Sequence, residues 1–158
     1  MKPTTLLRIA AVLALFQLIA HTSLVVSAHP THGPEEVALV AAMKSQHFHF
    51  ALATAPRSYW DFYFGYGLFA SFNCLVEAVL FWQLAGLART APSRVRPIAG
   101  LFCGANLVYA ALVWRFFFLV PLVPDVAIAL CLGGAVLALR DPKAAPTEQP
   151  DISRLTAQ

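Results

Sequence analysis

Four long apolar runs organise the whole sequence. A helix needs about 20 apolar residues, at a rise of 1.5 Å per residue, to cross the roughly 30 Å hydrocarbon core of a bilayer. The runs cover about residues 6–26, 58–87, 97–120 and 125–139. We therefore expect an all-α fold, a transmembrane four-helix bundle in contact with the lipid bilayer.

Composition excludes a water-soluble globule. Of the 158 residues, 59% are hydrophobic and only 12% are charged, which leaves too little polar surface to cover a soluble domain of this size. The net charge of +3 does not indicate nucleic-acid binding, because the basic residues are divided among short segments between the apolar runs. The three cysteines lie inside apolar runs, where we interpret them as packing residues.

Two capping patterns mark helix starts. Ser58 and Asp61 have the spacing of a capping box, which predicts the start of the second spanning helix. Pro34 is preset for the first turn of a shorter helix that we expect to end near Ser45. This helix is too short to span, so it is predicted to be amphipathic and to lie on the extracytoplasmic surface between the first two spanning helices.

A single transmembrane domain is predicted over residues 1–141. Within it, Pro121 and Pro124 predict a tight turn before the fourth helix, which would make the last two helices antiparallel neighbours. Residues 142–158 have no periodic apolar face and are predicted to form a disordered cytoplasmic tail.

Basic residues predict the orientation. One set of connections carries Lys2, Arg8, Arg89, Arg94, Arg96, Arg140 and Lys143. The positive-inside rule then places both termini in the cytoplasm, and we expect a multi-pass protein of a bacterial inner membrane. A rival interpretation treats residues 1–28 as a cleaved signal peptide. The presence of Gln17 and His21 on one helical face favours a retained span.

Glu77 lies near the middle of the second apolar run. An ionised carboxylate at bilayer depth costs several kcal/mol, so a chain that keeps one there usually pairs it, protonates it or uses it. Counting from the helix ends places polar residues of three helices at a similar depth. They are Gln17 and His21, Asn73 and Glu77, and Asn106 and Tyr109. We predict that these six side chains point inward and form a ligand-binding layer.

The polar layer has more than one interpretation. Interhelical hydrogen bonds worth about 1 kcal/mol each would explain it by helix packing alone. The layer would otherwise bind a ligand or handle protons. Whether the chain is an enzyme stays open, with Glu77 near His21 as the conceivable proton donor or base.

Charged residues expected near the extracytoplasmic membrane surface suggest structural ion pairs. Asp61, Arg115 and Asp125 come from three helices at comparable expected depth. Four histidines lie between the first and second spans, but no cysteine or well-placed carboxylate completes a metal site among them. They are His29, His32, His47 and His49. No cofactor motif is present either, so we expect neither a metal nor a cofactor.

Three stretches carry a resemblance to a known family. They are RSYWDFY at residues 57–63 followed by Gly65 and Gly67, then Glu77 further along, and RFF at residues 115–117. Together they resemble an uncharacterised family of small bacterial four-helix integral membrane proteins, and this resemblance implies the architecture without implying an activity. In layout alone, the chain is also similar to DoxX-like proteins and to sterol-isomerase-type bundles.

The sequence thus predicts an integral membrane protein that binds a small apolar ligand or a partner helix around its polar layer. One alternative is a structural or assembly subunit of a membrane complex. The other is a membrane enzyme that modifies a lipid or a quinone.

Overall fold

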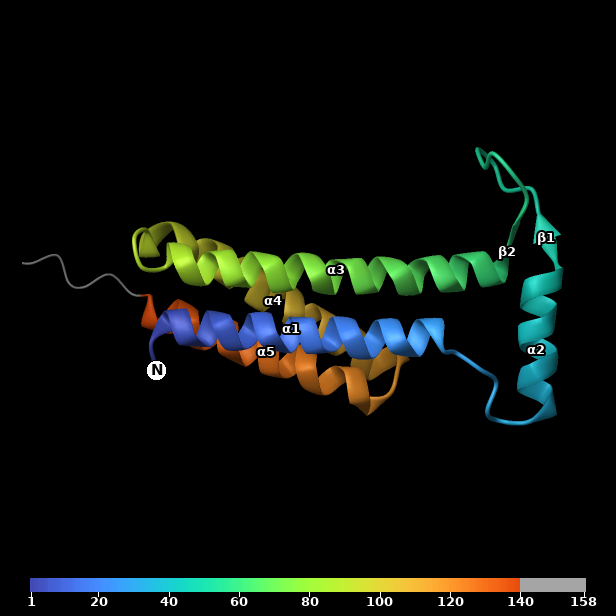
Figure 1. Cartoon of the computed structure of the whole chain (residues 1–158), viewed down its shortest axis with the longest axis horizontal. Helices are drawn as coiled ribbons and strands as arrows, with labels where there is room; N and C mark the ends of the chain where they lie inside the picture. Colours follow the sequence, from blue (N-terminus) through green and yellow to red (C-terminus); the bar gives the residue numbers. More distant parts are fainter. Residues whose placement is uncertain (140–158) are drawn as a thin grey trace, which may run out of the picture.

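The computed structural model describes residues 1–139 and contains four long helices. They are α1 (Pro3–Val26), α3 (Tyr59–Leu87), α4 (Pro92–Phe116) and α5 (Leu119–Ala138). Each of the four is long and apolar enough to cross a membrane. The expected all-α four-helix fold is confirmed (Figure 1).

The four helices run side by side in alternating directions. Helix α1 packs against both α3 and α5, and α4 packs against α5. The hydrogen bond of His21 to Ser71 and the stacking of Arg8 on Trp82 set the antiparallel register of α1 and α3. As a result, the N-terminus and the connection between α3 and α4 lie at one end of the bundle, and α2 lies at the other, which we call the α2 end (Figure 1).

Small residues allow α1 to approach its neighbours closely. The buried face of α1 includes Ala10, Ala11 and Ala14, each of which is at most 3% exposed. On α3, a Cβ atom built at Gly67 would lie 2.8 Å from a methyl group of Val25, so only glycine fits without a shift. Helix–helix contacts in membranes depend on such close packing because lipid removes most of the hydrophobic driving force.

Helices α3 and α4 meet in a different way. Their backbones approach each other at few positions. Phe81 and Phe102 fill the space between them in an edge-to-face contact, with ring centroids 5.5 Å apart. Phe81 is fully buried, so this aromatic pair acts as a spacer between the two helices.

A short helix and a two-stranded ribbon form the connection between α1 and α3. Helix α2 (Pro34–Ser45) lies across the end of the bundle (Figure 1), and the predicted bounds of this surface helix are confirmed. Strands β1 (His47–Phe48) and β2 (Arg57–Ser58) pair antiparallel. None of the residues of α2 is buried, and Lys44 Nζ lies 4.2 Å from the centre of the Trp60 ring at the start of α3.

Both predicted helix starts of this region are confirmed in atomic detail. The Asp61 amide donates to Ser58 Oγ at 3.1 Å, and the Ser58 amide donates to Asp61 Oδ2 at 2.8 Å, which completes the capping box. At α2, Glu36 Oε2 accepts hydrogen bonds from the amides of Thr31 and His32, both at 2.6 Å. The amide of His32 is the largest cause that holds the pKa of Glu36 below its usual value.

The third and fourth spanning helices begin earlier than the sequence suggested. Helix α4 starts at Pro92, which lacks only an amide hydrogen that the first turn does not need, and Pro97 lies inside the helix. Helix α5 starts at Leu119, so Pro121 and Pro124 lie within its first two turns and do not form the connection. The turn that makes α4 and α5 neighbours is at residues 117–118. The predicted tail over residues 142–158, with Arg140 and Lys143, lies outside the described residues.

Candidate functional site

A buried pair of polar side chains joins α3 to α4. Glu77 is 5% exposed and Asn106 is 1% exposed. Asn106 Nδ2 donates to the Phe102 carbonyl oxygen at 3.0 Å and lies 3.4 Å from Glu77 Oε1. Both residues were predicted to point into the polar layer, and the structure brings them together.

A second buried carboxyl group faces the interior from α5. Asp125 is 4% exposed, and its Oδ1 accepts a hydrogen bond from Gln17 Nε2 of α1 at 2.8 Å. The prediction had placed Asp125 near the membrane surface, because it took Asp125 as the start of the fourth helix. Helix α5 begins at Leu119, which moves Asp125 into its second turn and into the polar layer.

The two carboxyl groups therefore belong to one layer contributed by all four spanning helices. They are close enough for the charge of Asp125 to act on Glu77. The neighbours that the structure gives them are the neutral amides of Gln17 and Asn106, and within residues 1–139 neither carboxyl group forms a salt bridge. Two ionised, unpaired carboxylates in a buried site are too costly to persist together. The layer must hold a proton or meet a hydrogen-bond donor or cation.

A second polar contact joins α1 to α3 one helical turn nearer the α2 end. His21 Nδ1 and Ser71 Oγ lie 3.0 Å apart, and Ser71 is buried. His21 thus contacts α3, as predicted for an inward-facing residue, but its hydrogen-bond partner is Ser71 and not Glu77. Thr22 Oγ1 and Asn106 Oδ1 are buried atoms with no hydrogen-bond partner among the described residues. Both are able to accept a hydrogen bond.

Two of the six predicted layer residues do not point inward. Asn73 is exposed, and Tyr109 is 40% exposed. The prediction assumed that residues three or four positions apart share one buried face. Because α4 approaches α3 closely at few positions, the flank of α3 that carries Asn73 stays uncovered.

The predicted ion pairs among Asp61, Arg115 and Asp125 are not formed. Asp61 is occupied by the capping box, and Asp125 binds Gln17. The guanidinium group of Arg115 lies 5.3 Å from the centre of the Phe116 ring and does not contact either acid. Within residues 1–139, the structure forms one salt bridge, which joins His32 to Glu36 at the exposed start of α2.

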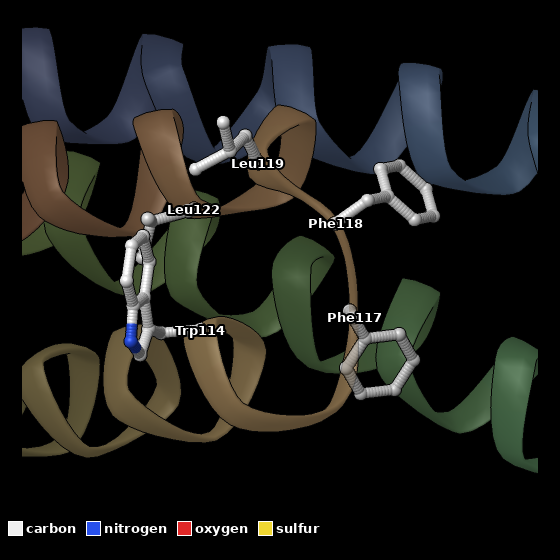
Figure 2. A pocket seen from close by; sticks show the side chains of 5 residues that line it. All are labelled: Trp114, Phe117, Phe118, Leu119 and Leu122. Carbon is white, nitrogen blue, oxygen red and sulfur yellow. The ribbon is translucent and has the colours of Figure 1, made fainter.

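Two cavities lie away from the polar layer. One, of about 140 Å³, is an open pocket at the connection of α4 and α5, where Trp114 and Leu122 face each other beside the turn (Figure 2). Its lining is completed by Phe117, Phe118 and Leu119. The other, of about 310 Å³, is a groove along the start of α3. In the part of the chain that the structure describes, no three His, Cys, Asp or Glu residues lie close enough to hold a metal ion.

Sequence reasoning missed Asp125 and Ser71 as members of the site, and it did not single out Thr22. Serine and threonine are frequent in spanning helices, so only their neighbours in space distinguish them. A prediction that started the fourth helix at an apolar residue before the two prolines would have placed Asp125 at the depth of the polar layer. No family model, curated protein or solved structure matches this chain.

Proposed function

We propose that this membrane protein binds a small, largely apolar molecule whose polar end donates hydrogen bonds to the layer around Glu77 and Asp125. The observation that carries the proposal is the pair of buried carboxyl groups with only neutral amide partners. A ligand hydroxyl or amine would supply a donor beyond these two amides.

Two buried polar atoms, one in the layer and one on α1, support the same ligand chemistry. Asn106 Oδ1 and Thr22 Oγ1 are buried without partners among residues 1–139. A buried acceptor without a donor costs roughly 1–3 kcal/mol, so a ligand that donates to these atoms gains that energy on binding. Asn106 Oδ1 only accepts, so a ligand that offers only acceptors would gain nothing from it, whereas the Thr22 hydroxyl is also able to donate.

The contact between α3 and α4 offers an entrance from the bilayer. Phe81 and Phe102 hold these helices apart. On the lipid side of the contact between Glu77 and Asn106, the flanking side chains of both helices are exposed. An apolar molecule that enters sideways from lipid would need to move side chains only. The closely packed contact of α1 with α3 offers no such opening.

Mass spectrometry of molecules that co-purify with the full chain in mild detergent tests the proposal. We expect an apolar compound with a hydroxyl or amine group in the wild type and its loss in Glu77→Leu. Asn73→Leu, on the exposed flank of the same helix, is the matched control and should retain the compound. Equal retention by Glu77→Leu and wild type would refute the assignment of the site.

Glu77→Gln separates binding from proton chemistry. The amide keeps an oxygen acceptor in place but has no titratable proton. Under the binding proposal this variant keeps part of the retained compound. If the protein modifies a lipid or a quinone, the variant would still bind the compound but would leave it unconverted.

A second candidate function is an assembly subunit, and one observation favours it. Asn73 is exposed near the midpoint of α3, at a depth where an amide side chain in lipid lacks partners. A partner helix that hydrogen-bonds to Asn73 would supply the missing partners. In that case Asn73→Leu, and not Glu77→Leu, would release a co-purifying protein.

For location, we propose a bacterial inner membrane with both termini in the cytoplasm. The support is the grouping of basic residues at the end of the bundle opposite α2. The described ones are Lys2, Arg8, Arg89, Arg94 and Arg96. Reporter fusions that fluoresce only in the cytoplasm, placed at each terminus, should both fluoresce. The resemblance to small bacterial four-helix membrane proteins is consistent with this placement and is likewise a proposal.

A further inference from the structure

The groove along the start of α3 combines two opposite charges with an apolar floor. Its volume is about 310 Å³. The lining residues are Arg57, Asp61, Phe62, Gly65, Tyr66 and Phe69. Gly65 has open space where a side chain would be, because a Cβ atom built there meets nothing within 4 Å.

The groove crosses from the headgroup layer into the hydrocarbon. Helix α3 has 29 residues, which at 1.5 Å per residue is about 43 Å, longer than the roughly 30 Å of a hydrocarbon core. The excess places the first turns of α3 among the lipid headgroups, and the aromatic side chains of Tyr59, Trp60 and Tyr63 suit that level. Arg57 and Asp61 therefore lie at headgroup depth, and Phe69 lies several ångströms deeper.

The two charges of the groove are separate and do not neutralise each other directly. No salt bridge joins Arg57 to Asp61 within the residues that the structure describes. The Asp61 carboxylate accepts one hydrogen bond from the Ser58 amide and keeps further acceptor capacity. The Arg57 side chain is exposed and free to bind an anion.

We propose that this groove binds a phospholipid whose headgroup ends in a primary ammonium group. The phosphate would bind the guanidinium group of Arg57, which matches phosphate oxygens with two parallel donors. The ammonium group would donate to Asp61 and lie against the ring of Phe62 or Tyr66. An acyl chain then follows Gly65 and Phe69 into the bilayer. The site is separate from the buried carboxyl layer and does not depend on the function proposed for it.

Native mass spectrometry of the full chain tests this assignment. Detergent-solubilised protein is mixed with equal amounts of phosphatidylethanolamine, phosphatidylcholine and phosphatidylglycerol, and the retained lipids are compared. The wild type should retain phosphatidylethanolamine best. Arg57→Gln should lower the retention of all three lipids. Asp61→Asn, which keeps an oxygen for the Ser58 amide, should remove the preference for the primary ammonium group.

A matched glycine pair controls for effects on folding. Gly65→Leu fills the groove, whereas Gly86→Leu adds the same side chain to an exposed site near the other end of α3 with nothing within 4 Å. Lipid retention should fall in Gly65→Leu and stay at the wild-type level in Gly86→Leu. Equal retention by the two variants would overturn the site. A lipid preference unchanged in Asp61→Asn, or a preference for phosphatidylglycerol, would overturn the headgroup assignment.

Discussion

Helix α3 contacts its two neighbours in opposite ways. Toward α1 it presents small residues, and the backbones come close enough that a Cβ atom at Gly67 would overlap Val25. Toward α4 it presents Phe81 and Glu77, which reach across a wider space to Phe102 and Asn106. The backbone of α3 thus packs closely against α1, whereas long side chains fill a wider space between α3 and α4.

The difference shows where a membrane protein of this size is able to hold polar groups. A contact between small residues leaves no room for a carboxyl group and its partners. A contact in which aromatic rings hold the helices apart leaves that room. Opening such a contact does not require closely packed backbones to separate. We therefore expect substitutions on the two sides of α3 to have different consequences.

The largest effect should follow removal of the aromatic spacer. Phe81→Ala deletes a fully buried ring and should lower the free energy of unfolding by about 3 kcal/mol, because the space that it leaves cannot close completely. Unfolding of the detergent-solubilised protein by a denaturing detergent measures this. Val79→Ala, at an exposed position nearby, is the control. A loss as small as that of the control would mean that α3 and α4 do not depend on the spacer.

The next effect should follow overfilling of the contact between α3 and α1. Gly67→Leu forces Val25 and the backbone of α1 away and should cost about 1–3 kcal/mol in the same assay. Gly104→Leu on α4 adds the same side chain where nothing lies within 4 Å. That control should unfold like the wild type or slightly later, since leucine favours helix over glycine. If both variants lost stability equally, the close contact would not be specific to α1.

Replacing the polar pair between α3 and α4 should change stability less. In the double variant Glu77→Leu with Asn106→Leu, two buried polar groups become apolar together, so neither is left unpaired. We expect the free energy of unfolding to change by less than about 1 kcal/mol, because buried polar groups contribute little net stability. The single variant Asn106→Leu should be less stable than the double variant. The opposite order would show that the pair is retained for packing.

The smallest effect should be confined to the start of α2. The pKa of Glu36 is lowered in the folded chain, so the stabilisation that it gives is present above the pKa of the unfolded state and is lost as the pH falls through the folded value. Hydrogen exchange at the amides of Thr31 and His32 should therefore quicken, relative to the intrinsic rates, as acid is added. Glu36→Gln should remove that pH dependence. Hydrogen exchange at the backbone amides of α3 should be the same in Glu36→Gln as in the wild type.

The helices were predictable from the sequence, because their signals are local. The capping box of Ser58 and Asp61 and the proline that opens α2 both act within four residues, and both were confirmed. The length of the apolar runs identified the four spans for the same reason. The misplaced starts of α4 and α5 came from prolines, which are compatible with the first turns of a helix as well as with the turn before it.

The candidate site was predictable only in part, because its members depend on which helices are neighbours. Glu77 and Asn106 were expected together from their depth, and they meet. Depth alone does not say that α4 stays at a distance from α3, so Asn73 was assigned to the interior although its flank of the helix is uncovered. Asp125 was missed because an error in one helix boundary moved it by almost two turns.

The unequal lengths of the spanning helices have a consequence for the surrounding bilayer. Helix α3 has 29 residues and α5 has 20, so one side of the molecule is about 43 Å tall and another about 30 Å. Because the first turns of α3 lie at headgroup level, the extra length of this helix stands in the headgroup layer and does not require the hydrocarbon core to thicken. Lipid headgroups beside α3 would then contact protein over a greater depth than those beside α5.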